Sequence, residues 1–318
     1  MSSTRAVVLH EPERLSLETI ALDPAGPEDA VVEVAFSGIS TGTERLLYTG
    51  RMPAFPGMGY PLVPGYESVG RVVDAGSHSG LSVGQGVYVP GARCYGEIRG
   101  LFGGAAARIV SPGARLAPLP DAFLDRPDGL AQGTLLALAA TAWHAVEIAG
   151  ETPDLIVGHG ALGRLIARIV VAKGGAPTVW ETNPARMDGA LGYRVVASAD
   201  DPRRDYRAVV DVSGDGRLLD TLISRLAPRG EVVLAGFYSE PLSFSFPPAF
   251  MREAHIRIAA EWQRADLDAT VSAVASGALS LDGLITHREV AEDAARAYRT
   301  AFEDPSCLKM ILDWRRTA

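Results

Sequence analysis

The stretch DLIVGHGALGRL, residues 154–165, carries the clearest chemical signal in the sequence. Three of its glycines give the spacing G-x-G-x-x-G directly after a strand-like run and at the start of a helix-like run. Glycines at this spacing let backbone amides approach a pyrophosphate, whose charge then lies at the positive end of the helix. We expect this turn to bind a dinucleotide through Gly158, His159, Gly160, Leu162 and Gly163. A tight turn of purely structural value is the alternative.

Glu181 ends the next strand-like run, roughly 20 residues after Gly160, where an acidic side chain accepts hydrogen bonds from the adenosine ribose. A carboxylate there repels the extra 2′-phosphate of NADP, so NAD is the favoured cofactor, although Arg186 close behind keeps NADP open. Two later strand ends fall at the same edge of the predicted sheet. They add Ser213, Gly236 and Phe237 as expected cofactor contacts, with ordinary turns as the alternative.

The composition excludes several classes of function. The chain has 318 residues, 47% of them hydrophobic, and a net charge of -8, so it offers no basic face to nucleic acid. No apolar run reaches the roughly 18 residues needed to span a membrane, and the N-terminus alternates like a strand rather than like a secretion signal. Cys94 and Cys307 are too few for a disulfide framework or a four-thiolate zinc site. We expect a soluble cytoplasmic protein.

Two stretches of the chain with different secondary-structure patterns must position the candidate functional residues. Residues 5 to about 120 are β-rich, with strand-like runs at 5–9, 30–38, 67–76, 83–90 and 106–110, which predicts a barrel or sandwich. Residues 129–150 form one long helical pattern. Beyond residue 154, strands rich in Val and Ile alternate with helical runs at 161–175, around 185–192 and at 216–230, which predicts a doubly wound parallel sheet of the α/β class.

This arrangement resembles the medium-chain dehydrogenase/reductase superfamily over the whole chain. The words that carry the resemblance are SGISTGTE (37–44), PGYESVG (64–70), VGQGVYVPG (83–91), GGAAARIV (103–110) and GLITH (283–287). The resemblance implies a GroES-like barrel over residues 1–128 and 278–318 that holds the substrate, and a Rossmann domain over 129–277 that holds NAD. It also implies Thr141 near the nicotinamide, Lys309 toward the pyrophosphate, and a possible homodimer formed through sheet edges.

The resemblance fails at the metal. Zinc-dependent members of the superfamily hold the catalytic ion with a cysteine in the first word, a histidine in the second, and a cysteine or carboxylate before the helix that contains Thr141. The matching positions here carry Ser40 or Thr41, Tyr66 and Ala137, none of which is a thiolate or imidazole ligand. The four-cysteine lobe of some members is also missing. We therefore expect no zinc in either site.

Without zinc, side chains must handle the hydroxyl proton of an alcohol. Tyr66 is the first candidate because a phenol can hydrogen-bond the substrate oxygen and pass on its proton, although a free pKa near 10 requires a neighbouring charge or relay before it acts as a base. Glu67 is an alternative proton acceptor, and Ser40, Thr41 and Thr43 are a possible hydroxyl relay to solvent. A tyrosine that fills the metal cavity and a carboxylate with a purely structural partner remain open.

Longer words resemble a narrower family, the dehydrogenases of bacteriochlorophyll biosynthesis; these include TGRMPAFPGMGYPLVPGYES, VWETNPAR, FPPAFMRE and CLKMILDW. This resemblance implies NAD-dependent oxidation of the 3-(1-hydroxyethyl) group of a chlorophyllide or bacteriochlorophyllide to 3-acetyl. A flat apolar chlorin needs a wide hydrophobic pocket. The residues expected to line it are Arg51, Met52, Phe55, Met58, Tyr60 and Phe250. The alternatives are a zinc-free quinone or enone reductase that uses NADPH, and a non-catalytic pigment carrier.

Overall fold

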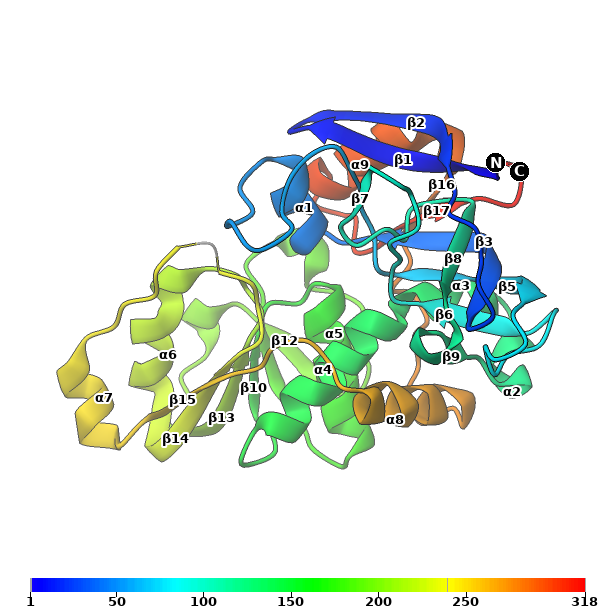
Figure 1. Cartoon of the computed structure of the whole chain (residues 1–318). Helices are drawn as coiled ribbons and strands as arrows, with labels where there is room; N and C mark the ends of the chain where they lie inside the picture. The colour runs from blue at the N-terminus through cyan, green and yellow to red at the C-terminus, as the bar shows by residue number, and fades with distance from the viewer. Residues whose placement is uncertain (1, 239, 318) are drawn as a thin grey trace. The chain divides into compact units, whose positions relative to one another are not determined.

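A computed structural model describes residues 2–238 and 240–317 and divides the chain into two compact units (Figure 1). Unit 1 comprises Met1–Ala137 and Asp282–Ala318, and unit 2 comprises Leu138–Leu281. Within the described ranges, no helix is long and apolar enough to cross a membrane.

Unit 1 is built from two β-sheets. One sheet has the order β2-β1-β4-β7, and the other has the order β16-β17-β3-β5-β6-β9, with β8 paired to β3. The strands are β1 (Ser3–Glu11), β2 (Arg14–Ala21), β3 (Asp29–Ile39), β4 (Leu62–Val63), β5 (Ser68–Ala75), β6 (Gly86–Val89), β7 (Arg99–Gly100), β8 (Arg108–Pro112), β9 (Ala117–Pro118), β16 (His287–Val290) and β17 (Met310–Asp313). Alternating buried residues such as Val32 and Val34 give β3 its inward face.

The C-terminal tail completes unit 1. β17 pairs antiparallel with β3, opposite residues 36–39, and β16 pairs with β17 on its other side. The helix between them, α9 (Ala294–Glu303), buries Ala297, Tyr298 and Phe302 in the same hydrophobic core as the first strands. Segments nearly 300 residues apart in the chain therefore share one core.

The helical pattern at 129–150 is divided in the structure. It forms α3 (Gly129–Gln132), a 3₁₀ turn (Gly133–Leu135) and α4 (Leu136–Ile148). A Cβ on Gly133 would lie 2.7 Å from the side chain of Val69, and Gln132 donates to Asp282, so the first part packs on unit 1. The boundary between the units consequently lies after Ala137, within the helical stretch, whereas the expected division was at 128.

Unit 2 is the doubly wound parallel sheet that the sequence predicts. Its strands are β10 (Leu155–Val157), β11 (Thr178–Trp180), β12 (Arg194–Val196), β13 (Tyr206–Asp211), β14 (Leu226–Leu234) and β15 (His255–Ile258), all parallel, in the order β12-β11-β10-β13-β14-β15. The helices between or beyond them are α5 (Ala161–Ala172), α6 (Leu219–Arg225), α7 (Phe246–Arg252) and α8 (Arg264–Ala275). The strand order reverses between β10 and β13, where α/β sheets bind ligands.

The expected helix around residues 185–192 is wrong. Only a 3₁₀ turn forms there, at Pro184–Arg186, and the chain then runs irregularly to β12. The guanidinium of Arg164 donates to the carbonyls of Arg186, Asp188 and Gly189, which a helix would have used itself. Gly189 also has a φ of +86°, in the left-handed region.

Candidate active site

The glycine turn of unit 2 joins β10 to the N-terminus of α5. Gly158 has a φ of +106°, which only glycine adopts readily, and a Cβ on Gly163 would lie 1.8 Å from the carbonyl oxygen of Gly158. At Gly160, by contrast, a Cβ would meet only a nitrogen of Arg186 at 3.9 Å. Gly158 and Gly163 therefore shape the turn, and Gly160 leaves room above it at the positive end of α5.

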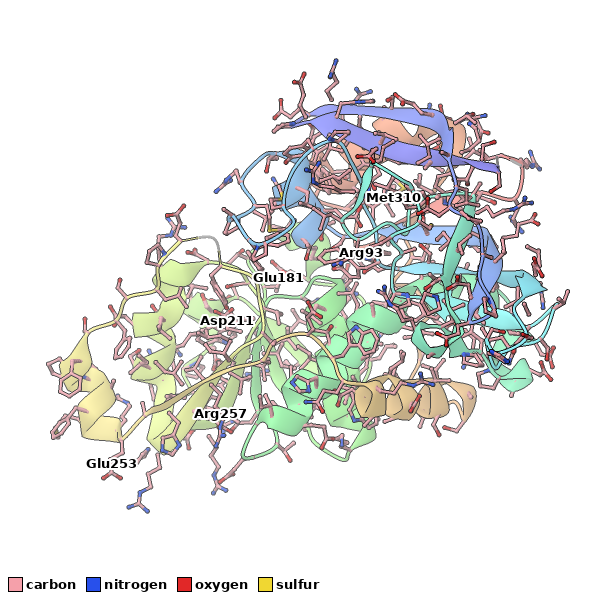
Figure 2. All side chains as sticks on the ribbon, viewed as in Figure 1. Arg93, Glu181, Asp211, Glu253, Arg257 and Met310 are labelled. Atoms are coloured by element: carbon pink, nitrogen blue, oxygen red, sulfur yellow. The ribbon has the colours of Figure 1, made fainter. Side chains whose placement is uncertain are left out.

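Glu181 follows β11 and binds back to the glycine turn. Its carboxylate accepts hydrogen bonds from the backbone N–H of His159 at 3.0 Å, and of Thr182 and Asn183 at 2.7 and 2.8 Å. Figure 2 labels Glu181 and Asp211 at the same end of the unit 2 sheet. This geometry fixes the carboxylate beside the turn, at the carboxyl edge of the parallel strands.

The ring of His159 is fully buried, and its surroundings do not suit a proton shuttle. One ring nitrogen lies 2.6 Å from the carbonyl oxygen of Arg186, and the other lies 2.8 Å from the hydroxyl of Tyr193. Burial lowers the pKa of His159 to about 4, so the ring is neutral at physiological pH. His159 therefore contributes its backbone N–H to the turn and its ring to packing.

Asp211 is a residue of this edge that the sequence analysis missed. It ends β13, accepts the N–H of Ser213 at 2.9 Å, and its carbonyl accepts the N–H of Gly236 at 3.0 Å. Burial raises its pKa above the ordinary value. Two of the expected cofactor residues, Ser213 and Gly236, are thus held at the switch point by one buried aspartate, while Phe237 is half exposed. Thr141 lies on α4 and is partly exposed.

In unit 1, Tyr66 forms a hydroxyl pair with Ser40. The phenol O–H donates to Ser40 Oγ at 2.8 Å, and the ring packs edge-on against Phe102. Loss of hydration and the nearby charge of Glu67 raise the pKa of Tyr66 well above its ordinary value, although hydrogen bonding with Ser40 and Thr43 opposes the shift. Tyr66 is therefore a neutral phenol, still partly exposed, that can donate one hydrogen bond while it accepts another.

Glu67 and Lys309 form a buried ion pair in unit 1. Lys309 Nζ lies 2.6 Å from Glu67 Oε2 and 3.3 Å from the carbonyl oxygen of Ile39, and the two residues are 1% and 0% exposed. The structure thus places Lys309 on Glu67, whereas the family resemblance implied a position at the pyrophosphate. A Cβ on Gly38 would come within 2.3 Å of Glu67 Oε2, so the glycine makes room for the carboxylate.

The backbone N–H of Ser40 binds Glu44, a second buried carboxyl that the sequence analysis did not select. It lies in α1 (Thr43–Tyr48), accepts the N–H of Ser40 at 3.0 Å, and accepts the O–H of Tyr298 at 2.6 Å. The only signal in the sequence was an acidic residue within the word SGISTGTE. Thr43, next to it, is partly exposed, and Thr41 is exposed.

The expected substrate residues lie in two places. Met52, Met58 and Tyr60 pack against a small cluster of buried leucines in unit 1, and the hydroxyl of Tyr60 donates to the carbonyl of Leu47 at 2.6 Å, while Arg51 and Phe55 stay exposed. Phe250 lies instead on α7 of unit 2, where it is 65% exposed beside the ring of Phe246. The apolar loop of residues 51–60 is therefore anchored by its methionines and tyrosine.

A metal-binding group is not found among residues 2–238 and 240–317, where no cluster of three His, Cys, Asp or Glu side chains could hold an ion. The positions that the family resemblance matched to zinc ligands carry Ser40 or Thr41, Tyr66 and Ala137.

Comparison with known proteins places the chain. Residues 26–121 match the Alcohol dehydrogenase GroES-like domain. The chain is 56% identical to the 2-desacetyl-2-hydroxyethyl bacteriochlorophyllide A dehydrogenase of Rhodobacter capsulatus over 315 residues, 98% of each chain. It is also 56% identical to the enzyme of that name from Cereibacter sphaeroides over 322 residues, 99% of each. The chain belongs to this dehydrogenase family.

The fold of the family agrees with solved structures. The 2R,3R-butanediol dehydrogenase of Bacillus subtilis superposes with a TM-score of 0.85 at 21% identity, over 98% of this chain and 99% of that one. L-idonate 5-dehydrogenase from Escherichia coli gives 0.84 at 19% identity, over 98% of both. A GroES-like unit and a Rossmann sheet, the architecture expected from the sequence, are thus confirmed as the medium-chain dehydrogenase fold.

Proposed function

We infer that this dehydrogenase uses NAD to oxidise the hydroxyethyl substituent of a bacteriochlorophyllide to an acetyl group, without a catalytic zinc ion. The observation that carries the inference is 56% identity, over nearly the whole chain, to two enzymes named for that substrate. The reaction takes a hydride from the carbinol carbon and a proton from the hydroxyl group. The residues of the two units supply groups suited to each task.

Unit 2 offers a cradle for a nicotinamide dinucleotide. The left-handed Gly158, the close approach of Gly163 to it and the open space over Gly160 suit a pyrophosphate at the N-terminus of α5, where the first N–H groups of a helix have no partner within the helix. Glu181, fixed by three N–H groups, supports NAD over NADP because its charge repels a 2′-phosphate. When bound, the nicotinamide ring accepts the hydride. Structural neighbours include one bound to NADP and one in complex with NAD.

Unit 1 offers a hydroxyl relay for the proton. Tyr66 is protonated, and its O–H donates a hydrogen bond to Ser40 Oγ. The lone pairs of the phenol oxygen are therefore available to accept a hydrogen bond from the substrate hydroxyl. As the carbinol oxygen gives its proton to Tyr66, Tyr66 gives its own to Ser40, and Ser40 passes its hydroxyl proton to a water molecule, which becomes hydronium and carries the proton to bulk solvent. The oxygens of Tyr66 and Ser40 each gain one proton and lose one, so no phenolate is formed, and the carbinol oxygen alone ends without its proton, as the carbonyl oxygen of the product.

The absence of zinc ligands is the second part of the proposal. A hydroxyl and a phenol at the first two ligand positions and a methyl at the third favour hydrogen bonding over Lewis-acid activation. Glu67 supports this assignment because its carboxylate is already paired with Lys309.

Substrate recognition is assigned to the loop of residues 51–60. Its methionines and tyrosine form an apolar surface on a firm base, which suits a flat macrocycle. The exposed guanidinium of Arg51 suits a propionate carboxylate of the pigment.

The test is a spectroscopic assay of the purified chain with a hydroxyethyl chlorin and either NAD⁺ or NADP⁺. We expect reduced cofactor and an acetyl chlorin in equal amounts, a strong preference for NAD⁺, and full activity after treatment with a chelator. Preference for NADPH together with reduction of a quinone or enone would favour the alternative hypothesis, a zinc-free quinone or enone reductase. Pigment binding without turnover would favour a carrier.

A further inference from the structure

The Tyr66–Ser40 hydroxyl pair rests on a buried carboxyl that the proton relay leaves without a role. Glu44 Oε1 accepts the backbone N–H of Ser40 at 3.0 Å, and Glu44 Oε2 accepts the hydroxyl of Tyr298 at 2.6 Å. Glu44 and Tyr298 are 1% and 2% exposed. Each carboxyl oxygen is thus fixed by a donor, and both donors favour the ionised form.

The charges around Glu44 do not balance when every group is ionised. The titratable groups around it are Tyr66 and Glu67 ahead of β5, Lys309 ahead of β17 and the hydroxyl of Tyr298 on α9. Lys309 is committed to Glu67 by a contact of 2.6 Å. One ammonium therefore serves two buried carboxyls, and no cation of residues 2–238 and 240–317 forms an ion pair with Glu44.

This imbalance brings Glu44 into the physiological range of pH. Burial raises the pKa of Glu44 to about 7, the hydrogen bonds from Tyr298 and Ser40 oppose the rise, and the charge of Glu67 adds to it. The ionised carboxylate accepts both hydrogen bonds, whereas a protonated carboxyl must use one of its oxygens as a donor.

We propose that Glu44 is a positioning residue, whose ionised carboxylate holds the Ser40 backbone and thereby the Tyr66–Ser40 hydroxyl pair in place for proton transfer. The inference rests on the proposed function. Glu44 acts through Ser40 and touches neither substrate nor cofactor in this scheme. Oxidation of the alcohol accordingly speeds up as Glu44 loses its proton, and this step belongs to Glu44 rather than to Tyr66, which stays neutral throughout.

The experiment compares the dependence of kcat on pH in the full chain, in Glu44→Gln and in Tyr298→Phe, with NAD⁺ and a hydroxyethyl chlorin as substrates. In the unaltered protein we expect kcat to rise through a midpoint near neutral pH. Glu44→Gln should lose this rise, with kcat about tenfold lower at about pH 8 and nearly unchanged at about pH 6, because the neutral amide no longer titrates. The Kd for NAD⁺ should stay the same in both variants.

Tyr298→Phe separates positioning from general damage. Removing the hydroxyl takes one donor from the carboxylate, so the midpoint should move upward by about half a pH unit or more while kcat at high pH is largely kept. This variant also carries the test if Glu44→Gln does not fold.

The outcomes separate the two proposals. A protein that does not turn over the hydroxyethyl chlorin with either cofactor overturns the proposed function, and this inference with it. A protein that turns over, but whose midpoint survives unchanged in Glu44→Gln or does not move in Tyr298→Phe, overturns the role of Glu44 alone. An equal loss of kcat at every pH in Glu44→Gln would also overturn it, because a merely structural role has that signature.

Discussion

Tyr66 stands at the position that the family resemblance matched to a histidine ligand of zinc, and its surroundings keep it protonated. Burial of the hydroxyl and the negative charge of Glu67 both act against a phenolate. A tyrosine in this state works as a donor and acceptor in a relay, which differs from the role of a general base that draws the proton by its own charge. In the proposed relay its partner is Ser40, whose Oγ accepts the phenol O–H at 2.8 Å.

The relay predicts the behaviour of Tyr66→Phe. Removing the hydroxyl breaks the relay, so kcat should fall by about a hundredfold, while the Kd for NAD⁺ stays the same because the cradle lies in unit 2. Steady-state kinetics and cofactor titration measure the two quantities. Tyr88→Phe is the matched control, because its hydroxyl donates to the backbone carbonyl of Tyr66 and takes no part in the relay. Unchanged turnover in Tyr66→Phe would show that the hydroxyl takes no part in catalysis and that the ring only fills space.

The raised pKa of Glu44 also predicts how stability depends on pH. The folded value of about 7 exceeds the ordinary value of 4.5, so the folded state holds this proton more tightly than the unfolded state does. The stabilisation is complete below about pH 4.5 and is lost as the pH rises to about 7, a change of about 3 kcal/mol at most.

Glu44→Gln should remove that loss. Denaturant titrations at about pH 5.5 and about pH 7.5 should show a smaller fall in the free energy of unfolding for the variant than for the unaltered protein. Glu147→Gln, which alters an exposed pair with Lys173, should follow the unaltered protein. Parallel curves for all three proteins would show that Glu44 does not titrate in this range.

At this scale the sequence reveals types and local spacing, but not partners that are distant in the chain. Tyr66, Glu67 and Ser40 could be selected from short words, and the structure brings Tyr66 and Ser40 together. The pairing of Glu67 with Lys309 and of Glu44 with Tyr298 joins residues more than 200 positions apart, and both depend on the tail folding onto β3. No local pattern encodes such contacts, so Glu44 was missed.

Among the elements, the turn from β10 to α5 contains two glycines of the same G-x-G-x-x-G motif, Gly160 and Gly163, that differ in function. Gly163 has no room for a side chain, since its Cβ would meet the carbonyl of Gly158 at 1.8 Å. Gly160 has φ and ψ of -73° and -171°, which alanine adopts readily, and nothing of the protein crowds it.

The two substitutions should therefore fail in different ways. Gly163→Ala should lower the thermal midpoint by several degrees or prevent folding, because the strand and the helix must move apart. Gly160→Ala should fold with a midpoint close to that of the unaltered protein yet bind NAD⁺ at least tenfold more weakly, because its methyl group enters the space of the pyrophosphate. Thermal melts and cofactor titration distinguish them. Normal NAD⁺ affinity in Gly160→Ala would show that the dinucleotide does not use this turn.

The element predictions succeed where periodicity is strong and fail where a distant side chain intervenes. Runs of Val and Ile correctly predict β1, β3, β5 and the strands β10 to β14 of unit 2, because buried strands leave a clear apolar pattern. The exposed strand β15 was not predicted. The two-residue strands β4, β7 and β9 leave none. Residues 185–192 look helical by composition, but Arg164 binds their carbonyls from α5.

At the scale of the whole molecule, the sheet of unit 2 has two edge strands among the described residues, β12 and β15, and β15 is the one that lies in sequence next to the exposed apolar helix α7. Within the part of the chain that the structure describes, β15 pairs with β14 and with no other strand. Figure 1 shows β15 and α7 together in yellow and orange at one end of this sheet. Large apolar side chains are exposed on both elements: Phe246, Phe250 and Met251 on α7, and Ile256 and Ile258 on β15. Open edges and large apolar patches of this kind mark interfaces.

A second copy of the chain is the expected occupant, because two β15 edges related by a twofold axis can pair with each other and satisfy both rows of free backbone groups. Ile258→Asp combined with Phe250→Asp should convert a dimer into a monomer in sedimentation velocity, since two charges per copy would be buried in the interface. Val83→Asp, which alters an apolar residue 67% exposed in unit 1, should leave the dimer intact. A protein that sediments as a monomer before any substitution would contradict the prediction and leave the patch on α7 available for the pigment, the role that the sequence first suggested for Phe250.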